Sequence, residues 1–169
     1  SNFAMVARDA DSKTRRDYMH KLAGELLTGP PAEGKIMTAA MQRGHDMEPE
    51  ARELYARRAI VKLDRVGFIR RRLPSGRFAG CSPDGLIGDD GGIECKCPEA
   101  HPHLEYLLGG GVPKDYFAQV HGSMYVTGRP WWKFMSYNPY FPPLLVHVER
   151  DDAIQKVLHE SLGKFVVDL

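Results

Sequence analysis

The segment 82–97 constrains the fold of this chain most strongly. It reads Ser-Pro-Asp-Gly-Leu-Ile, then an acidic, glycine-rich loop, and then Ile-Glu-Cys-Lys-Cys. Alternate side chains of a β-strand point to the same face of a sheet. The second run therefore predicts a strand over 92–97. Glu94 and Lys96 project together from one face of it, and the isoleucine and both cysteines point from the other face into a core.

This strand and the turn before it bring together groups that suit metal chemistry. Asp84 ends the turn, so two carboxylates and an amine lie close in sequence. Mg²⁺ prefers oxygen ligands and is often held by one or two carboxylates together with a substrate phosphate. Asp84 and Glu94 would supply those carboxylates, with the backbone carbonyl of Cys95 as a third ligand. Lys96 would orient an attacking water or offset charge in the transition state.

Two simpler interpretations of the same residues stay open at this point. Ser-Pro-Asp-Gly is also a favourable turn sequence, because proline presets φ and glycine adopts positive φ. Glu94 and Lys96 would also form a plain exposed salt pair, which contributes little to stability. Spacing alone does not choose between these interpretations and a metal site.

Composition bounds the class of protein. The chain has 169 residues, a net charge of +1 and three cysteines. These values indicate one soluble, globular domain over 1–169, and the abrupt start at Ser1 is compatible with missing upstream sequence. No apolar run approaches the roughly 20 residues of a membrane span, and no secretory signal is visible. Three cysteines do not form a disulfide framework, so we expect a reduced, cytoplasmic setting in a bacterial or phage-infected cell.

Histidines and basic residues carry weaker signals. His101 and His103 lack a second ligand cluster and are typical of ordinary loop histidines rather than a zinc site. The near-neutral charge argues weakly against a non-specific nucleic-acid binder. Charged runs are usually solvated surface, although phosphate contact is an alternative. Two such basic patches are present: Arg70, Arg71, Arg72 and Arg77 in one, and Arg52, Arg57 and Arg58 in the other.

Periodicity and turn residues predict an alternation of helices and strands. We expect helices over 13–27, 34–59, 103–108, 114–126 and from Asp151 or Asp152 to about 165, and strands over 61–72, 77–81, 92–97, 131–137 and 144–149. Proline lacks an amide donor, so Pro49 is expected to kink or split the second helix. This order predicts an α/β (α+β) fold with a central mixed β-sheet flanked by helices. Trp131 and Trp132 are assigned to the core or an interface, with base stacking as the alternative.

Four blocks, in order, resemble the phage lambda exonuclease and YqaJ-type viral recombinase family of PD-(D/E)XK nucleases. Asp84 followed by Glu94-Cys-Lys matches the Asp…Glu-X-Lys pattern of that superfamily. The resemblance covers about residues 44–150 and implies a restriction-endonuclease-like core. The blocks are 43–51 with Tyr55, 81–86, 93–98, and 116–120 followed by 131–132 and 137–139.

The resemblance implies a role for each matching residue. Asp84 and Glu94 would be metal ligands for Mg²⁺, which Mn²⁺ can replace, and Lys96 would be the catalytic lysine. An acidic residue from the preceding helix, Glu48, would lie near the metal or its water; the simpler interpretation is that it caps a half-helix and pairs with Arg52. Gln119 would support the site or position the substrate, and Tyr116 would lie beside it. Ser82 and Ser1 would contact a terminal phosphate.

The resemblance also implies an activity and partners. It indicates an exonuclease that digests linear double-stranded DNA from 5′ to 3′ and leaves single strands for an annealing protein in recombination. Family members form rings of three subunits, so a homotrimer is expected, which would let a near-neutral subunit hold DNA in a lined channel. Two alternatives remain: an endonuclease of the nicking or restriction type with the same metal site, and a DNA-binding module that has lost catalysis.

Overall fold

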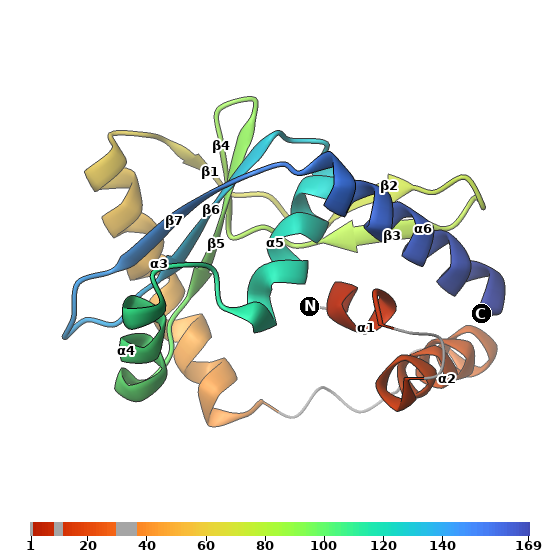
Figure 1. Cartoon of the computed structure of the whole chain (residues 1–169). Helices are drawn as coiled ribbons and strands as arrows, with labels where there is room; N and C mark the ends of the chain where they lie inside the picture. The colour runs from red at the N-terminus through yellow and green to blue at the C-terminus, as the bar shows by residue number, and fades with distance from the viewer. Residues whose placement is uncertain (1, 9–11, 30–36) are drawn as a thin grey trace.

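The computed structural model describes residues 2–8, 12–29 and 37–169. A central sheet lies among helices that pack on both of its faces (Figure 1). None of the helices in the described ranges combines the length and apolar character needed to cross a membrane. The elements are α1 (Phe3–Val6), α2 (Lys13–Thr28), α3 (Ala39–Ala59), β1 (Leu63–Asp64), β2 (Ile69–Arg72), β3 (Phe78–Cys81), β4 (Gly85–Ile87), β5 (Gly91–Lys96), α4 (Ala100–Gly109), α5 (Lys114–Thr127), β6 (Trp131–Ser136), β7 (Leu144–Glu149) and α6 (Asp152–Asp168).

Five strands form a mixed sheet in the order β1-β4-β5-β6-β7. Strands β5 and β6 are parallel, and every other neighbouring pair is antiparallel. A parallel pair needs a long crossover, which α4 and α5 supply. Strand β4 pairs only with the first half of β5, where Gly85 lies opposite Ile93. The second half of β5, which carries Glu94 and Lys96, therefore has no strand on its β4 side.

Each face of this sheet is covered by a different helix. On one face, Ala51 and Tyr55 of α3 pack against Ile93, Cys95 and neighbouring apolar residues. The predicted inward stripe of β5 is thus confirmed. On the other face, residues of α5 pack against Trp132 and Phe134 of β6. Because Glu94 pairs with Phe134 in the parallel ladder, its side chain points to the α5 face.

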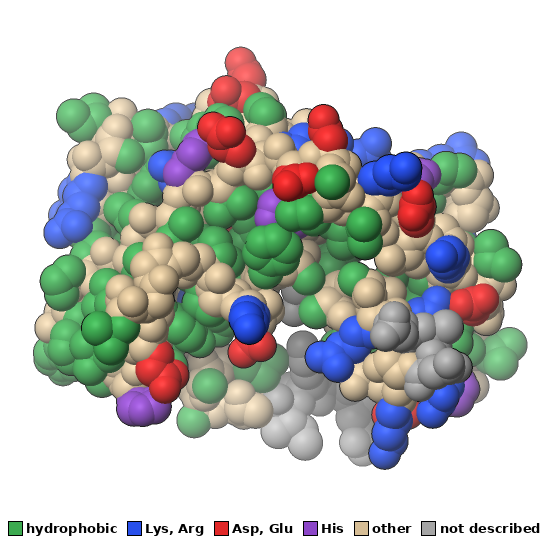
Figure 2. All heavy atoms as spheres, in the orientation of Figure 1, with side chains coloured by type: hydrophobic (Ala, Val, Ile, Leu, Met, Phe, Trp, Pro, Cys, Tyr) green, Lys and Arg blue, Asp and Glu red, His purple; other side chains and the backbone are tan. Residues whose placement is uncertain are grey.

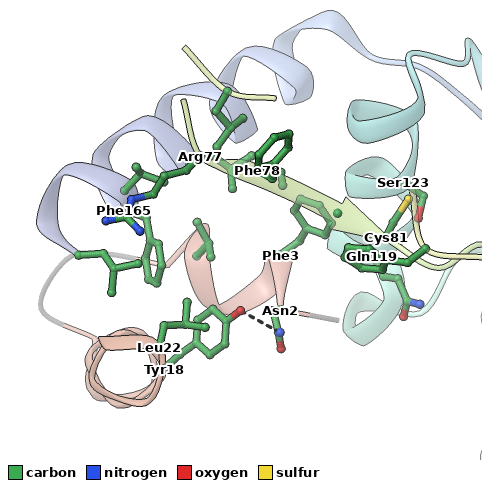
Figure 3. Close-up of a pocket in the computed structure, with 18 of the residues that line it drawn as sticks. Asn2, Phe3, Tyr18, Leu22, Arg77, Phe78, Cys81, Gln119, Ser123 and Phe165 are labelled. Carbon is green, nitrogen blue, oxygen red and sulfur yellow. Dashed lines mark hydrogen bonds between the residues drawn. The ribbon is translucent and has the colours of Figure 1, made fainter. Parts of the chain in front are cut away.

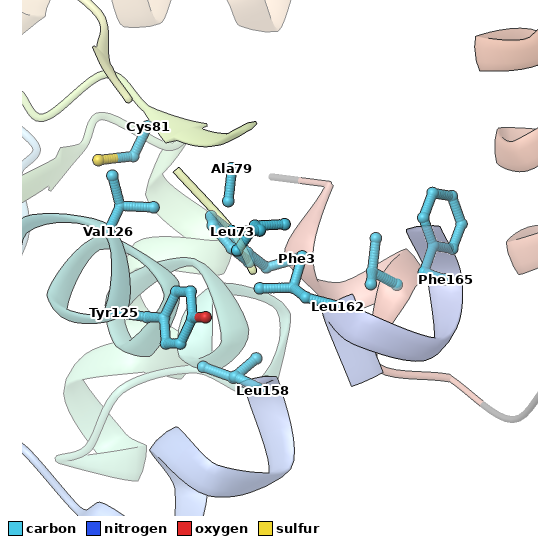
Figure 4. Close-up of a cluster of buried hydrophobic side chains, with 10 residues drawn as sticks. Phe3, Leu73, Ala79, Cys81, Tyr125, Val126, Leu158, Leu162 and Phe165 are labelled. Carbon is cyan, nitrogen blue, oxygen red and sulfur yellow. The ribbon is translucent and has the colours of Figure 1, made fainter. Parts of the chain in front are cut away.

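A third apolar cluster joins the N- and C-terminal helices to a separate two-stranded hairpin formed by β2 and β3. Phe3 of α1, Tyr125 of α5 and Phe165 of α6 meet residues of this hairpin in the cluster (Figure 4). Buried Arg15 of α2 reaches the same region, where its Nη2 atom donates to Asp168 Oδ2 at 2.8 Å. The hairpin, which leads directly into the turn at Asp84, is therefore held by packing at some distance from the central sheet.

Most predicted elements are confirmed, including the mixed sheet with flanking helices. The helix expected at 103–108 is the longer α4, and Asp151 caps α6 by accepting hydrogen bonds from Ala153 N and Ile154 N. Trp132 is fully buried in the core, against Gly92, where an added Cβ would lie 2.3 Å from the indole ring. Trp131 is half-buried and contacts His147 with the two rings tilted by 42° and their centroids 5.4 Å apart.

The structure differs from several predictions about local structure. The single strand expected over 61–72 is two strands in different sheets, because the intervening 65–68 segment, with Gly67, leaves the ladder. Strand β4 and helix α1 were not expected; both are too short to show a period. Helix α3 begins after Thr38 rather than at Gly34 and is one helix to Ala59, so Pro49 does not split it; a kink at Pro49 stays a prediction. Residues 34–36 lie outside the described residues.

The histidines at 101 and 103 lie in α4 rather than in a loop. His103 is fully buried, with Nδ1 at 2.7 Å from Ser136 Oγ and Nε2 at 3.0 Å from the Pro142 carbonyl. Both ring nitrogens therefore have partners, and this histidine joins α4 to β6 and to the segment after it. An isolated histidine in sequence gives no sign of such burial.

Candidate active site

Asp84 lies in the turn immediately before β4, beside the unpaired half of β5. Its Oδ2 atom accepts a hydrogen bond from the backbone amide of Cys95 at 2.6 Å. The carboxylate thus takes the place that a backbone carbonyl would hold if β4 were longer. Pro83 is buried, and proline fixes the backbone φ angle. The turn therefore places one carboxylate against the middle of β5.

Glu94 and Lys96 meet Gln119 on the α5 face of the sheet. Glu94 is only 1% exposed, and its Oε1 atom accepts hydrogen bonds from Lys96 Nζ at 2.5 Å and from Gln119 Nε2. Its Oε2 atom is buried and has no hydrogen-bond partner among the described residues. The interpretation as an exposed salt pair is therefore wrong. A buried carboxylate oxygen without a partner is costly and points to a bound cation or other ligand.

Glu48 reaches the same region from α3. Its Oε1 atom accepts a hydrogen bond from Arg52 Nη1, one turn further along the helix. The same guanidinium nitrogen lies 3.5 Å from the backbone carbonyl of Asp84. The predicted pairing of Glu48 with Arg52 is thus present. It also brings the acidic side chain toward the turn that carries Asp84.

Tyr116 of α5 forms an aromatic wall beside Lys96. The Lys96 Nζ atom lies 5.2 Å from the centroid of the Tyr116 ring. This ring stacks on Phe134 of β6, with centroids 5.5 Å apart, and meets Tyr106 of α4 edge-on at 6.1 Å. The lysine is therefore held between an acidic partner and an aromatic face.

The electrostatics of the site favour an added positive charge. Burial, followed by the charge of Glu94, raises the pKa of Asp84 to about 8, although the bond from Cys95 N opposes the shift. Burial also raises the pKa of Glu94, against the lowering effect of Lys96. Burial acts to lower the pKa of Lys96, but Glu94 and Asp84 outweigh it and the net shift is upward. One ammonium group thus does not balance the buried carboxylates.

A pocket of about 830 Å³ lies between α3, α4 and the end of β5, and Glu94 and Gln119 are not among the described residues that line it. Its lining includes Glu48, Asp84, Cys95, Lys96 and Tyr116. No group of three or more His, Cys, Asp or Glu side chains within 2–8, 12–29 and 37–169 is arranged to hold a metal. The carboxylate pair would therefore need oxygen ligands from backbone, water or substrate, which is the usual arrangement for Mg²⁺.

Ser82 does not line this pocket. It is exposed and lines a neighbouring pocket of about 850 Å³, which Gln119, Ser123 and Cys81 also line (Figure 3). Gln119 therefore lines the pocket of Ser82 while its amide donates to Glu94. Ser1, the other residue assigned to a terminal phosphate, lies outside the described residues.

Sequence reasoning missed two arginines that shape the site. Arg43 Nε donates to the Cys97 carbonyl at 3.1 Å, which ties α3 to the end of β5. Arg129 Nη1 donates to the carbonyls of Gly88 and Gly91 at 2.9 and 2.6 Å, which holds the β4–β5 turn. Their targets are backbone carbonyls, which have no sequence signature. Only the position of Arg43 inside a motif block gave any signal.

Comparisons with known proteins identify similar structures and a matching family. An alkaline exonuclease, LHK-Exo, from Laribacter hongkongensis is 34% identical to this chain, covers 99% of it with 84% of its own length, and superposes with a TM-score of 0.86. The same protein in complex with dAMP gives 34% identity over 99% of this chain and 86% of its own, with a TM-score of 0.83.

A more distant match is a phage-related exonuclease from Haemophilus somnus 129PT, which is 15% identical to this chain. The match covers 97% of this chain and 90% of that protein with a TM-score of 0.67, and it supports the fold alone. No curated protein matches the sequence significantly. The family model for the YqaJ-like viral recombinase domain matches residues 1–130. The chain therefore belongs to the YqaJ-like viral recombinase domain family.

Proposed function

We propose that this protein is a metal-dependent exonuclease that hydrolyses the phosphodiester bonds of linear double-stranded DNA. The observation that carries the proposal is the convergence of Asp84, Glu94 and Lys96 beside one pocket. The likeness to an alkaline exonuclease at 34% identity supports the same activity.

Mg²⁺ fits the residues of this pocket, and Mn²⁺ would fit the same ligands. Glu94 Oε2 is buried without a partner among the described residues, and burial together with neighbouring acidic charge raises the pKa of Asp84 to about 8. A divalent cation would relieve both costs. Asp84, Glu94 and the carbonyl of Cys95 would hold it. When bound, such an ion polarises the phosphoryl group and lowers the pKa of a bound water.

The side chains around the carboxylates position the reacting groups. Lys96 remains cationic, so it would orient the attacking water or stabilise negative charge on the phosphoryl oxygens. Gln119 fixes the Glu94 carboxylate through its hydrogen bond. Glu48, anchored by Arg52, would accept a proton from a water molecule in the pocket.

Contacts further from the reacting bond would select the substrate end. Tyr116 lines the pocket and would contact the terminal nucleotide, and exposed Ser82 would bind a terminal phosphate from the neighbouring pocket. We propose digestion from 5′ to 3′, a ring of three subunits, and transfer of the single strand to an annealing protein. These three features are supported by the family resemblance.

Linear and covalently closed duplexes test the activity. The protein with Mg²⁺ should degrade linear duplex and leave closed circular DNA intact, and a chelator should stop the reaction. Lys96→Ala should remain folded and lose at least about 100-fold in rate, since a preorganised charge in the site is removed. Cutting of the closed circle would identify an endonuclease instead. Full activity in Asp84→Ala would refute the assigned site. End-labelled duplexes with 5′-phosphate or 5′-hydroxyl ends would test the polarity.

A further inference from the structure

The outer face of the β2–β3 hairpin carries arginine and phenylalanine side chains that have no role in the site described above. In its register, Arg70 lies opposite Gly80 and Arg72 lies opposite Phe78. The alternate β3 residues point inward and belong to the apolar cluster at α5 and α6. Arg70, Arg72 and Phe78 therefore share the outward face.

Two aromatic rings on this face are exposed to solvent. Phe68 is 66% exposed and Phe78 is 55% exposed. The Phe68 ring lies directly on Gly80, where an added Cβ would come within 2.1 Å of it. The Arg70 guanidinium lies over the Phe78 ring, 4.9 Å from its centroid. Each ring is an exposed aromatic group, one against a glycine and one under a guanidinium, on which another planar group can stack.

The positive charge on the hairpin is not neutralised by the described part of the chain. Arg70, Arg72 and Arg77 form none of the ion pairs found there. Arg71 differs, because its Nη1 atom donates to the Tyr125 carbonyl at 2.5 Å and its guanidinium lies 4.8 Å from that ring's centroid. On the face shown in Figure 2 acidic and basic side chains are interspersed, so an arginine group without carboxylate partners is a local feature.

A pocket connects the hairpin to Gln119, which donates a hydrogen bond to Glu94 of the candidate active site. The 850 Å³ pocket is lined by Phe68, Phe78 and Arg77 at the hairpin and by Ser82 and Gln119 at its other end. Figure 3 shows Arg77 and Phe78 on the hairpin and Gln119 on α5 around the pocket. No carboxylate side chain is among the described residues that line it. Asp84 follows Phe78 by six positions in the chain, roughly 20 Å if fully extended.

We propose that this hairpin face binds single-stranded DNA next to the candidate active site. Arg70, Arg72 and Arg77 contact phosphates, while Phe68 and Phe78 stack on bases. A surface for phosphate alone would need only the arginines. Stacking requires bases that are not already paired and stacked in a duplex, and alternating cationic and aromatic groups are the means by which proteins hold single strands. The inference rests on the proposed action on DNA and adds the strand that the site holds.

Binding of a short labelled oligothymidylate to the full chain, followed by fluorescence anisotropy in EDTA, tests this proposal. Phe68→Ala and Phe78→Ala should each weaken binding about 5- to 150-fold, the range for loss of one stacked base. Phe78→Trp should retain affinity, because a larger ring can still stack. Arg70→Ala should reduce the slope of log affinity against log salt by about 0.7, which is one phosphate contact on a single strand.

Matched controls separate stacking from a general surface effect. Tyr140→Ala removes an aromatic ring that is 85% exposed but lies outside the hairpin, and Arg58→Ala removes an exposed arginine of α3. Both should bind the oligonucleotide as the unaltered chain does. Wild-type affinity in both phenylalanine variants would overturn the proposal. An equal loss of blunt duplex binding, or a change in oligomeric state without a change in DNA affinity, would also overturn it.

Failure of the inference and failure of the proposed function are distinguishable. Binding in EDTA requires no turnover, so the hairpin can be tested even if the protein hydrolyses no DNA. Hydrolysis of linear duplex together with unchanged oligonucleotide binding in the hairpin variants would refute the inference alone. Hairpin-dependent binding without any hydrolysis would refute the exonuclease proposal alone.

Discussion

Replacing Asp84 by asparagine should stabilise the metal-free protein while removing its activity. The asparagine side chain is isosteric with that of aspartate, and its amide oxygen can still accept the hydrogen bond from Cys95 N. What disappears is a buried negative charge beside Glu94. Burial and that neighbouring charge raise the pKa of Asp84 from 3.8 to about 8, so the ionised form is disfavoured in the folded state.

The sign and size of the effect follow from this shift. A carboxyl whose pKa is higher in the folded state binds its proton more tightly there, so stability falls as pH rises from about 4 to about 8. The rise of the pKa from 3.8 to about 8 corresponds to a ceiling on the order of 6 kcal/mol, at 1.36 kcal/mol per pH unit. Because Asp84 and Glu94 interact and protonation of one relieves the other, we expect half or less, about 2–3 kcal/mol.

Thermal unfolding in EDTA at pH 5 and pH 8.5 measures this difference. For a chain of this size 1 kcal/mol shifts Tm by roughly 2–4 °C, so Asp84→Asn should gain roughly 4–12 °C relative to the wild type between these two pH values. Mg²⁺ at 100 times its Kd should raise the free energy of unfolding of the wild type by about 2.7 kcal/mol, and its Tm should rise accordingly. The Tm of the variant should stay almost unchanged when Mg²⁺ is added. Equal Tm values for both proteins across pH, or an equal response to Mg²⁺, would refute the reasoning.

Three further substitutions test supporting contacts. Gln119→Ala removes a donor to the Glu94 carboxylate, so single-turnover cleavage should slow about 10- to 100-fold with little change in DNA affinity, the range for a hydrogen bond to a charged group; an unchanged rate would contradict this role. Arg52→Ala leaves Glu48 unpaired, so it should lower the rate of metal-dependent turnover while changing the free energy of unfolding only slightly. Arg57→Ala, which removes an exposed arginine of the same helix, should change neither the rate nor the free energy of unfolding. Arg129→Ala removes the hydrogen bonds to the β4–β5 turn and should lower the free energy of unfolding by about 2–3 kcal/mol in urea titrations; a change below about 0.5 kcal/mol would show that the turn holds its shape without it.

Sequence predicted the parts of the fold that have a regular period. The alternation of Glu94 and Lys96 with apolar neighbours is evident from the five residues 93–97 alone. Asp151 was likewise recognised as a possible N-cap of α6 from its position in the sequence. Strand β4 is not visible, because three residues are too few to show a period and its sequence is also a good turn. The division of 61–72 depends on which sheet each half can join, and that is decided by distant residues.

The structure brings Asp84, Glu94 and Lys96 close together and contains the predicted Glu48–Arg52 pair, but several other contacts of the candidate site were not predicted. Asp84, Glu94 and Lys96 are close in sequence, so their proximity needs only a turn and a strand. Gln119 comes from a helix after a long crossover, and only the family resemblance indicated it. The hydrogen bond from Gln119 to Glu94, and the separation of Ser82 into a second pocket, depend on packing that sequence does not encode locally.

The two carboxylates share a feature that supports the proposed cation site. The chain engages one oxygen of each: Asp84 Oδ2 takes the Cys95 amide, and Glu94 Oε1 takes Lys96 and Gln119. The second oxygen of Glu94 is buried without a partner among the described residues. Each carboxylate is thus oriented by bonds that do not occupy all of its acceptor capacity. Such an arrangement is costly in the empty protein and favourable with an added positive charge, because desolvated acceptors interact strongly with a cation and have little freedom left to lose.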